Sequence, residues 1–257
     1  MQNITRKTLD SILAFLKNEI IKRGFRQVVV GLSGGIDSAV VTLLCHKALE
    51  GNTKALLMPS LNSSQASIDD SINLCVAFGI EYVLMPIKDF DNTFCMLYPN
   101  HTKLERGNFC ARMRMATLYH VAQMEGRLVV GTSNKTEIML GYGTIFGDLA
   151  YAINPIGNLY KTQIYMLAKM LHIPTQIINK APSADFYDGQ TDEKELGYSY
   201  DDIDKFLESY QAQKGDITKL AQYDKDMVEK LHKRIQNNVF KQKMPTIFMD
   251  LAFNENG

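Results

Sequence analysis

An aspartate stands inside a glycine-rich turn near the start of the chain, in the string GLSGGIDSAV from Gly31 to Val40. Glycines let backbone N–H groups approach a phosphate, and serine hydroxyls and the start of a following helix add donors. Asp37 would repel that anion, and no lysine follows the glycines before Lys47 to offset its charge. A Mg²⁺ ion between carboxylate and phosphates removes the conflict. The alternative is a plain strand-to-helix turn, in which Gly supplies unusual backbone angles and Ser or Asp caps the helix.

The elements around this turn alternate between strand and helix. Continuous apolar runs predict four buried strands in QVVVGL, KALLMP, EYVLMPI and, from Arg127, RLVVGTS. Apolar residues at helical spacing predict helices around residues 9–20, 40–48, 68–76 and 104–125. The pattern indicates an α/β fold with a doubly wound parallel sheet and helices on both faces, where ligands bind beyond the carboxyl ends of strands.

The second half of the chain is predicted to be mainly helical. Helices are expected at about 161–171, 201–213 and 224–238. The segment 184–200, ADFYDGQTDEKELGYSY, is polar, acidic and without periodicity, and we interpret it as a mobile loop. The length suits one domain over residues 1–257.

Composition limits the possible partners. Lys+Arg and Asp+Glu both number 28, so no basic surface favours a nucleic acid. The four cysteines have neither CxxC spacing nor nearby His pairs, and we interpret them as reduced thiols of a cytoplasmic protein. Charged residues interrupt the first 25 positions, so no signal peptide is predicted, and no apolar run is long enough for a membrane span.

Four strings together resemble known families. The string SGGIDS resembles the signature of the ATP pyrophosphatase, or PP-loop, superfamily. The strings GNFCARMRM (107–115), GTSNKTEIMLGYGTIFGD (131–148) and KAPSADFYDGQTDEKELGYSYDDID (180–204) resemble motifs of the NAD synthetases, in that family's order. The resemblance implies an adenine nucleotide alpha hydrolase-like fold. It also implies amidation of nicotinic acid adenine dinucleotide by ammonia through an acyl-adenylate, with ATP as co-substrate and Mg²⁺ as cofactor.

The same resemblance implies roles for individual residues. It implies that Asp37 and Glu137 bind Mg²⁺ and that Arg112 and Lys241 bind the dinucleotide. It also implies two catalytic residues: Lys161, which contacts the ATP phosphates, and Asp148, which receives the incoming ammonium. The positions matching ATP contacts are Gly31, Leu32, Ser33, Gly34, Gly35, Ile36, Asp37, Ser38, Thr132, Lys161 and Ser183.

Several of these residues also have an ordinary structural interpretation. Thr132 or Ser133 would cap a helix, and Glu137 would be a solvated charge in a first turn. Arg112 and its neighbour Arg114 would lie on a solvated helix face, and Asp148 would be a turn residue.

The chain also departs from one branch of the family. Ile145 replaces a lysine in the GFFTKFGD-type loop, and Phe240 stands where an HKR motif has histidine, leaving Lys241 as the nearest match. These differences concern substrate affinity rather than reaction class.

Three other functions were compared with this interpretation. A tRNA-modifying thiolase or lysidine-type ligase needs a basic surface and often catalytic cysteines. GMP synthetase resembles the chain only in the opening loop. A regulatory nucleotide-binding module without catalysis needs no second carboxylate, no lysine at the phosphates and no acidic loop. The chain has a candidate for each, in Glu137, Lys161 and the segment 184–200.

The resemblance finally bears on partners and nitrogen source. It implies a homodimer with the dinucleotide across the subunit interface, and the helices flanking Arg112 would partly form that interface. Glutamine-using members carry a nitrilase-type glutaminase domain, and only a short helix precedes the loop at Gly31, so we expect free ammonia as the donor and no glutaminase domain.

Overall fold

A four-stranded parallel sheet forms the centre of the computed structural model, which describes residues 3–182, 191–243 and 245–248. The strands are β1 (Val28–Gly31), β2 (Thr53–Leu57), β3 (Glu81–Leu84) and β4 (Leu128–Val130). Their order is β3-β2-β1-β4, with Val28 in register with Thr53 on one side and with Leu128 on the other. The four predicted strands and the doubly wound α/β fold are therefore confirmed.

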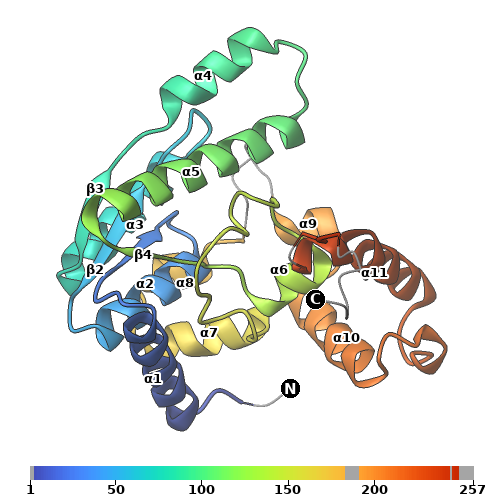
Figure 1. Ribbon diagram of the computed structural model, residues 1–257. Helices are drawn as coiled ribbons and strands as arrows, with labels where there is room; N and C mark the ends of the chain where they lie inside the picture. Colours follow the sequence, from blue (N-terminus) through green and yellow to red (C-terminus); the bar gives the residue numbers. More distant parts are fainter. Residues whose placement is uncertain (1–2, 183–190, 244, 249–257) are drawn as a thin grey trace, which may run out of the picture.

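Alternate residues of β1 face two different cores. Val28 and Val30 belong to the larger core, with α1 (Arg6–Lys22), α2 (Ile36–Ala48), α3 (Gln65–Phe78) and α7 (Lys161–Met170). Val29 faces the opposite way and packs with α5 (Lys103–Glu125). Figure 1 shows α5 on one side of the sheet and α1 and α7 on the other. Both faces of the central strand are covered, which explains its unbroken apolar sequence.

The β3 edge is less covered than the sequence predicts. All four residues of β3 are exposed, because the strand lies at the edge of the sheet. The helix α4 (Lys88–Leu97), which the sequence analysis did not predict, packs along α5 on the outer side of the molecule (Figure 1).

A second, helical layer follows the sheet in sequence. A separate apolar core joins α6 (Lys135–Leu140), α10 (Tyr200–Ala212) and α11 (Lys225–Asn238), which lie together in Figure 1. The remaining elements are the helices α8 (Thr175–Asn179) and α9 (Asp192–Leu196) and the 3-10 helices η1 (Ile217–Lys219) and η2 (Val239–Gln242).

The structure corrects one prediction in this region. The segment 184–200 was expected to be a loop, but its described part contains α9 and the first residue of α10. At five residues, α9 is too short to show helical periodicity, so it could not be predicted from a periodic pattern. Residues 184–190 of the expected loop lie outside the described residues.

Candidate active site

The glycine-rich turn joins the carboxyl end of β1 to the amino end of α2. Its conformation is fixed by Ser38, whose hydroxyl accepts from the Ser33 N–H at 3.2 Å and donates to the Gly35 carbonyl at 3.0 Å. No side chain caps α2, whose N-cap is Gly35, so the first N–H groups of this 13-residue helix point out of its end. Such an end attracts an anion, and Asp37 lies in its first turn.

A second carboxylate comes from the loop after β4. β4 is hydrogen-bonded to β1 in parallel, and the order in which the chain adds strands to the sheet reverses between them. Ligands bind at such a point in open α/β sheets. Asn134 caps α6: its side chain accepts from the Glu137 N–H at 2.9 Å, and Glu137 accepts from the Asn134 N–H at 3.2 Å. Asn134 also donates to Oδ1 of Asp37 at 2.9 Å. The Asn134 cap therefore links the loop after β4 to the glycine-rich turn after β1.

Lys161 joins both carboxylates. Its Nζ lies 2.5 Å from Oδ2 of Asp37 and 3.4 Å from Oε1 of Glu137. The Lys161 side chain is 3% exposed, against 15% for Asp37 and 17% for Glu137. Burial raises the pKa of the Glu137 carboxyl to about 8, and the Asp37 charge adds to this rise. Burial opposes the charged form of Lys161, but both carboxylates outweigh it and raise the pKa of the ammonium.

The backbone of Lys161 is anchored independently of its side chain. The Lys161 N–H donates to Oγ1 of Thr136 at 3.0 Å, and the next N–H, of Thr162, donates to Oδ2 of Asp204 at 2.8 Å. Asp204 is fully buried and also accepts from the Thr136 and Thr162 hydroxyls. The first turn of α7 is thus tied to α6 and α10, and this fixes the direction from which Lys161 enters the site.

A third carboxylate, Asp192, lies beside this cluster. It is 4% exposed and accepts from the hydroxyls of Tyr142 at 3.0 Å and Tyr200 at 2.8 Å. The Tyr200 ring lies next to Lys161, with Nζ 5.2 Å from the ring centroid. Burial raises the pKa of the Asp192 carboxyl. Among the described residues, no group of three or more His, Cys, Asp or Glu forms a ready metal cage.

A second set of predicted residues gathers around the segment 141–148. Lys241 donates to the carbonyls of Gly141 at 2.9 Å and Gly143 at 3.0 Å, and Arg112 donates to the Ile145 carbonyl at 3.4 Å. Asp148 accepts from the Thr144 N–H at 2.6 Å. Asp148 keeps contact with solvent, yet desolvation by the surrounding protein raises the pKa of its carboxyl.

Comparisons with known proteins identify the family of the chain. The family model "NAD synthase" matches residues 8–245. The chain belongs to the NAD synthase family. It is 50% identical over 241 residues to the NH₃-dependent NAD⁺ synthetase of Wolinella succinogenes, covering 93% of this chain and 94% of that protein.

Two solved structures extend the likeness to three dimensions. The NH₃-dependent NAD synthetase of Campylobacter jejuni, in complex with a nitrate ion, is 38% identical with a TM-score of 0.81, over 95% of this chain and 98% of that one. The NMN synthetase of Francisella tularensis is 33% identical with a TM-score of 0.86, over 95% and 99%. The fold of the NAD synthase family thus spans nearly the whole chain.

The remaining predicted residues that the structure describes lie outside the cluster of Asp37, Glu137 and Lys161. Thr132 lies in the loop after β4 but does not cap α6, and neither does Ser133, because Asn134 holds that position. The Arg112 side chain is exposed, whereas Nε of Arg114 donates to the Met58 carbonyl at 3.0 Å and helps hold the end of β2. Ser183 lies outside the described residues.

Sequence reasoning missed four polar residues that build the site. All four lie inside the NAD synthase motifs already quoted. Asn134 bonds to Asp37 and Lys180 to the turn, whereas Asp192 and Asp204 bond to Tyr200 and Thr162, next to Lys161. Lys180 donates to the Gly34 carbonyl at 3.3 Å and pairs with Asp70 of α3. Asn134 could have been found from its N-x-x-E spacing, which is a capping signal.

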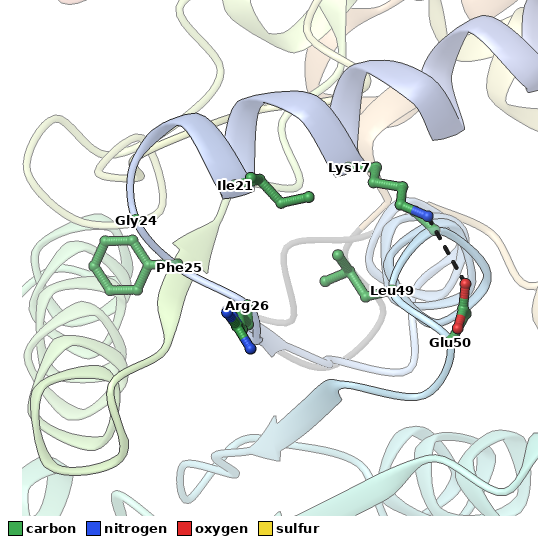
Figure 2. Close-up of a pocket in the computed structure, with 8 residues that line it drawn as sticks. Lys17, Ile21, Gly24, Phe25, Arg26, Leu49 and Glu50 are labelled. Carbon is green, nitrogen blue, oxygen red and sulfur yellow. Dashed lines mark ion pairs between the residues drawn. The ribbon is translucent and has the colours of Figure 1, made fainter.

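A hollow of about 530 Å³ lies elsewhere in the molecule (Figure 2). It is bounded by the end of α1, the residues before β1 and the end of α2, with Lys17 and Glu50 3.8 Å apart at its rim. It therefore adjoins the amino end of β1, whereas the Asp37 cluster adjoins the carboxyl end. None of the predicted site residues lines it.

Proposed function

We propose that the chain catalyses amidation of nicotinic acid adenine dinucleotide by ammonia, with ATP giving AMP and pyrophosphate through an acyl-adenylate. The observation that carries the proposal is the meeting of Asp37, Glu137 and Lys161 at the carboxyl ends of β1 and β4. Membership of the NAD synthase family supports the same reaction. A free carboxylate is a poor electrophile, and adenylation supplies the leaving group that ammonia needs.

The turn from Gly31 to Ser38 would bind the ATP phosphates through its backbone N–H groups and the end of α2. The donor set of Asp37 and Glu137 fits Mg²⁺, because a single cation, the Lys161 ammonium, already contacts both oxygens. Bound there, Mg²⁺ would offset the charge of the triphosphate. Lys161 would stabilise the charge that develops on departing pyrophosphate. Thr132 and Ser183 are proposed to contact ATP.

The group around segment 141–148 would handle the other substrates. Arg112 is proposed to bind the dinucleotide, since its exposed guanidinium can form paired hydrogen bonds with a phosphate or carboxylate. Lys241 would support the same subsite by holding the loop carbonyls. Asp148 is proposed to attract ammonium and accept its proton, because its carboxylate is accessible and its raised pKa makes it a better base.

We also propose a homodimer that joins through α4, α5 and β3. Several large apolar side chains are exposed on these elements: Val83, Leu84, Phe90, Met96, Leu97, Tyr98, Leu104 and Met124. Patches of this kind mark protein interfaces. Sedimentation should give twice the mass of 29.0 kDa, and Met96→Asp with Leu97→Asp should shift it towards the monomer.

A cytoplasmic location is proposed on the free thiols of the described cysteines, three of them buried. No described helix is long and apolar enough to cross a membrane.

The substrate can be tested directly. Because the chain is similar to an NMN synthetase, nicotinic acid mononucleotide is the alternative substrate to compare with the dinucleotide. The purified chain should be assayed with each acid, ATP, Mg²⁺ and ammonium chloride, and kcat/KM should be higher for the dinucleotide. Preference for the mononucleotide would overturn the dinucleotide assignment but not the amidation.

A further inference from the structure

The Lys161 ammonium contacts both of the carboxylates that are proposed to share a metal ion, Asp37 and Glu137. Its Nζ is 2.5 Å from one carboxylate and 3.4 Å from the other. We infer that Lys161 acts as a resident counter-ion in the nucleotide-free chain, and that a divalent cation binds stably only when arriving phosphates draw the ammonium away. This inference rests on the proposed two-carboxylate magnesium site.

The two cations cannot share this position. Asn134 already donates to Oδ1 of Asp37 at 2.9 Å and to Oε2 of Glu137 at 3.2 Å. An ion shared by the two carboxylates would therefore take the side of Oδ2 and Oε1, where the ammonium lies. The two positive charges also repel each other strongly in a site where Lys161 is 3% exposed. Entry of the metal therefore requires Lys161 to move.

The movement is confined to the side chain. The N–H groups of Lys161 and Thr162 are held by Thr136 and Asp204, so the start of α7 stays in place. The buried ammonium needs a replacement partner, because water does not reach it freely. The oxygens of a triphosphate bound at the neighbouring Gly31–Ser38 turn would supply one. The Tyr200 ring, with its centroid 5.2 Å from Nζ, lines the same space.

Lys161 would thus have two successive partners, first the carboxylates and then the phosphates. The consequence is strong coupling between metal and nucleotide: the cation and ATP bind well together, and the cation binds poorly alone. This coupling would keep free divalent cations out of the site. Lys161 would then act as a counter-ion before ATP binds and at the departing pyrophosphate afterwards.

Mn²⁺ is the appropriate probe, because its free and bound forms can be measured by electron paramagnetic resonance without turnover. The wild-type chain should bind Mn²⁺ weakly alone and at least tenfold more tightly with α,β-methylene-ATP. Lys161→Met should bind Mn²⁺ alone at least tenfold more tightly than the wild type. Lys169→Met, an exposed lysine change on the same helix, should match the wild type.

The outcomes separate this inference from the proposed function. Tight, Asp37-dependent Mn²⁺ binding by the nucleotide-free wild type would overturn the inference even if Lys161→Met failed to fold. So would a folded Lys161→Met that gains no affinity. If Asp37→Asn and Glu137→Gln leave Mn²⁺ binding with the nucleotide analogue unchanged, the proposed metal site itself is wrong. Loss of the gain in a Lys161→Met, Asp37→Asn double variant would support the inference.

Discussion

The Tyr200 hydroxyl donates to Oδ2 of Asp192 across 2.8 Å, and both residues are at least 95% buried. Tyr142 donates to the other oxygen of the same carboxylate at 3.0 Å. Asp192 thus joins the start of α10 to the loop after α6, and the Tyr200 ring lies beside the Lys161 ammonium. A residue outside the predicted site therefore shapes the space in which Lys161 moves.

Tyr200→Phe should lower the free energy of unfolding by about 1–3 kcal/mol, because a buried carboxylate loses a hydrogen-bond partner. Urea denaturation followed by circular dichroism would measure the change. Tyr119→Phe is a matched control, since Tyr119 is 40% exposed, and should change stability by less than about 0.5 kcal/mol. Equal stability of the two variants would show that the Asp192 contact contributes nothing.

Gly34→Ala should damage the Gly31–Ser38 turn, which is proposed to bind the ATP phosphates, more than a glycine change elsewhere. Gly34 has φ +80°, and an added Cβ would lie 2.3 Å from the Ser67 carbonyl oxygen, so the turn must shift. Gly79→Ala is the control: it also has positive φ, +65°, but its Cβ would meet nothing within 4 Å. We expect Gly79→Ala to cost about 1–2 kcal/mol of backbone strain with ATP affinity unchanged. Gly34→Ala should cost more and weaken ATP binding measured by calorimetry.

Asp91 gives a defined dependence of stability on pH. Burial favours the neutral carboxyl of Asp91, but two hydrogen bonds from Arg106 and one from the Leu61 N–H outweigh it and lower its pKa below that of an ordinary aspartate. The stabilisation is therefore fully present once the pH is well above the pKa of an ordinary aspartate, and it disappears as the pH falls through the lowered pKa of Asp91.

The matching variant is Asp91→Asn, which leaves Arg106 without its carboxylate. At neutral pH it should be less stable than the wild type by about 3 kcal/mol, as for a broken buried ion pair. Urea denaturation over a pH series should show this difference shrinking in acid. A difference that stays constant down to the acid range would contradict the assigned pKa direction.

Lys161→Ala should slow the chemical step. If the ammonium stabilises departing pyrophosphate, its loss should cost about 3 kcal/mol, or a factor of about 100 in kcat. Single-turnover measurements at saturating ATP would separate chemistry from binding. An unchanged kcat with a raised KM for ATP would show that Lys161 helps to bind ATP but does not stabilise the departing pyrophosphate.

The elements of the sheet could be predicted from the sequence because their signals are local. QVVVGL and RLVVGTS are continuous apolar runs, and they became the neighbouring strands β1 and β4. Because these two strands are neighbours in the sheet, Asp37 and Glu137 lie close enough to share the contact with Lys161.

The residues that support the site could not be predicted in the same way. Asp204 and Asp192 have no periodicity or spacing that distinguishes them from the other acidic residues of their segment. Their importance depends on contacts with Thr162 and Tyr142, which lie 42 and 50 positions away. The edge position of β3 depends equally on strand order, so its exposure was missed.

In the proposed function, the chain couples ATP cleavage between the α and β phosphates to amidation of the dinucleotide acid by free ammonia. The most direct measurement is product stoichiometry by chromatography, with the purified chain, nicotinic acid adenine dinucleotide, ATP, Mg²⁺ and either ammonium chloride or ammonia-free glutamine. We expect equal amounts of NAD and AMP with ammonium chloride, and no NAD with glutamine alone. Formation of ADP in place of AMP, or no NAD from ammonium chloride, would contradict the account.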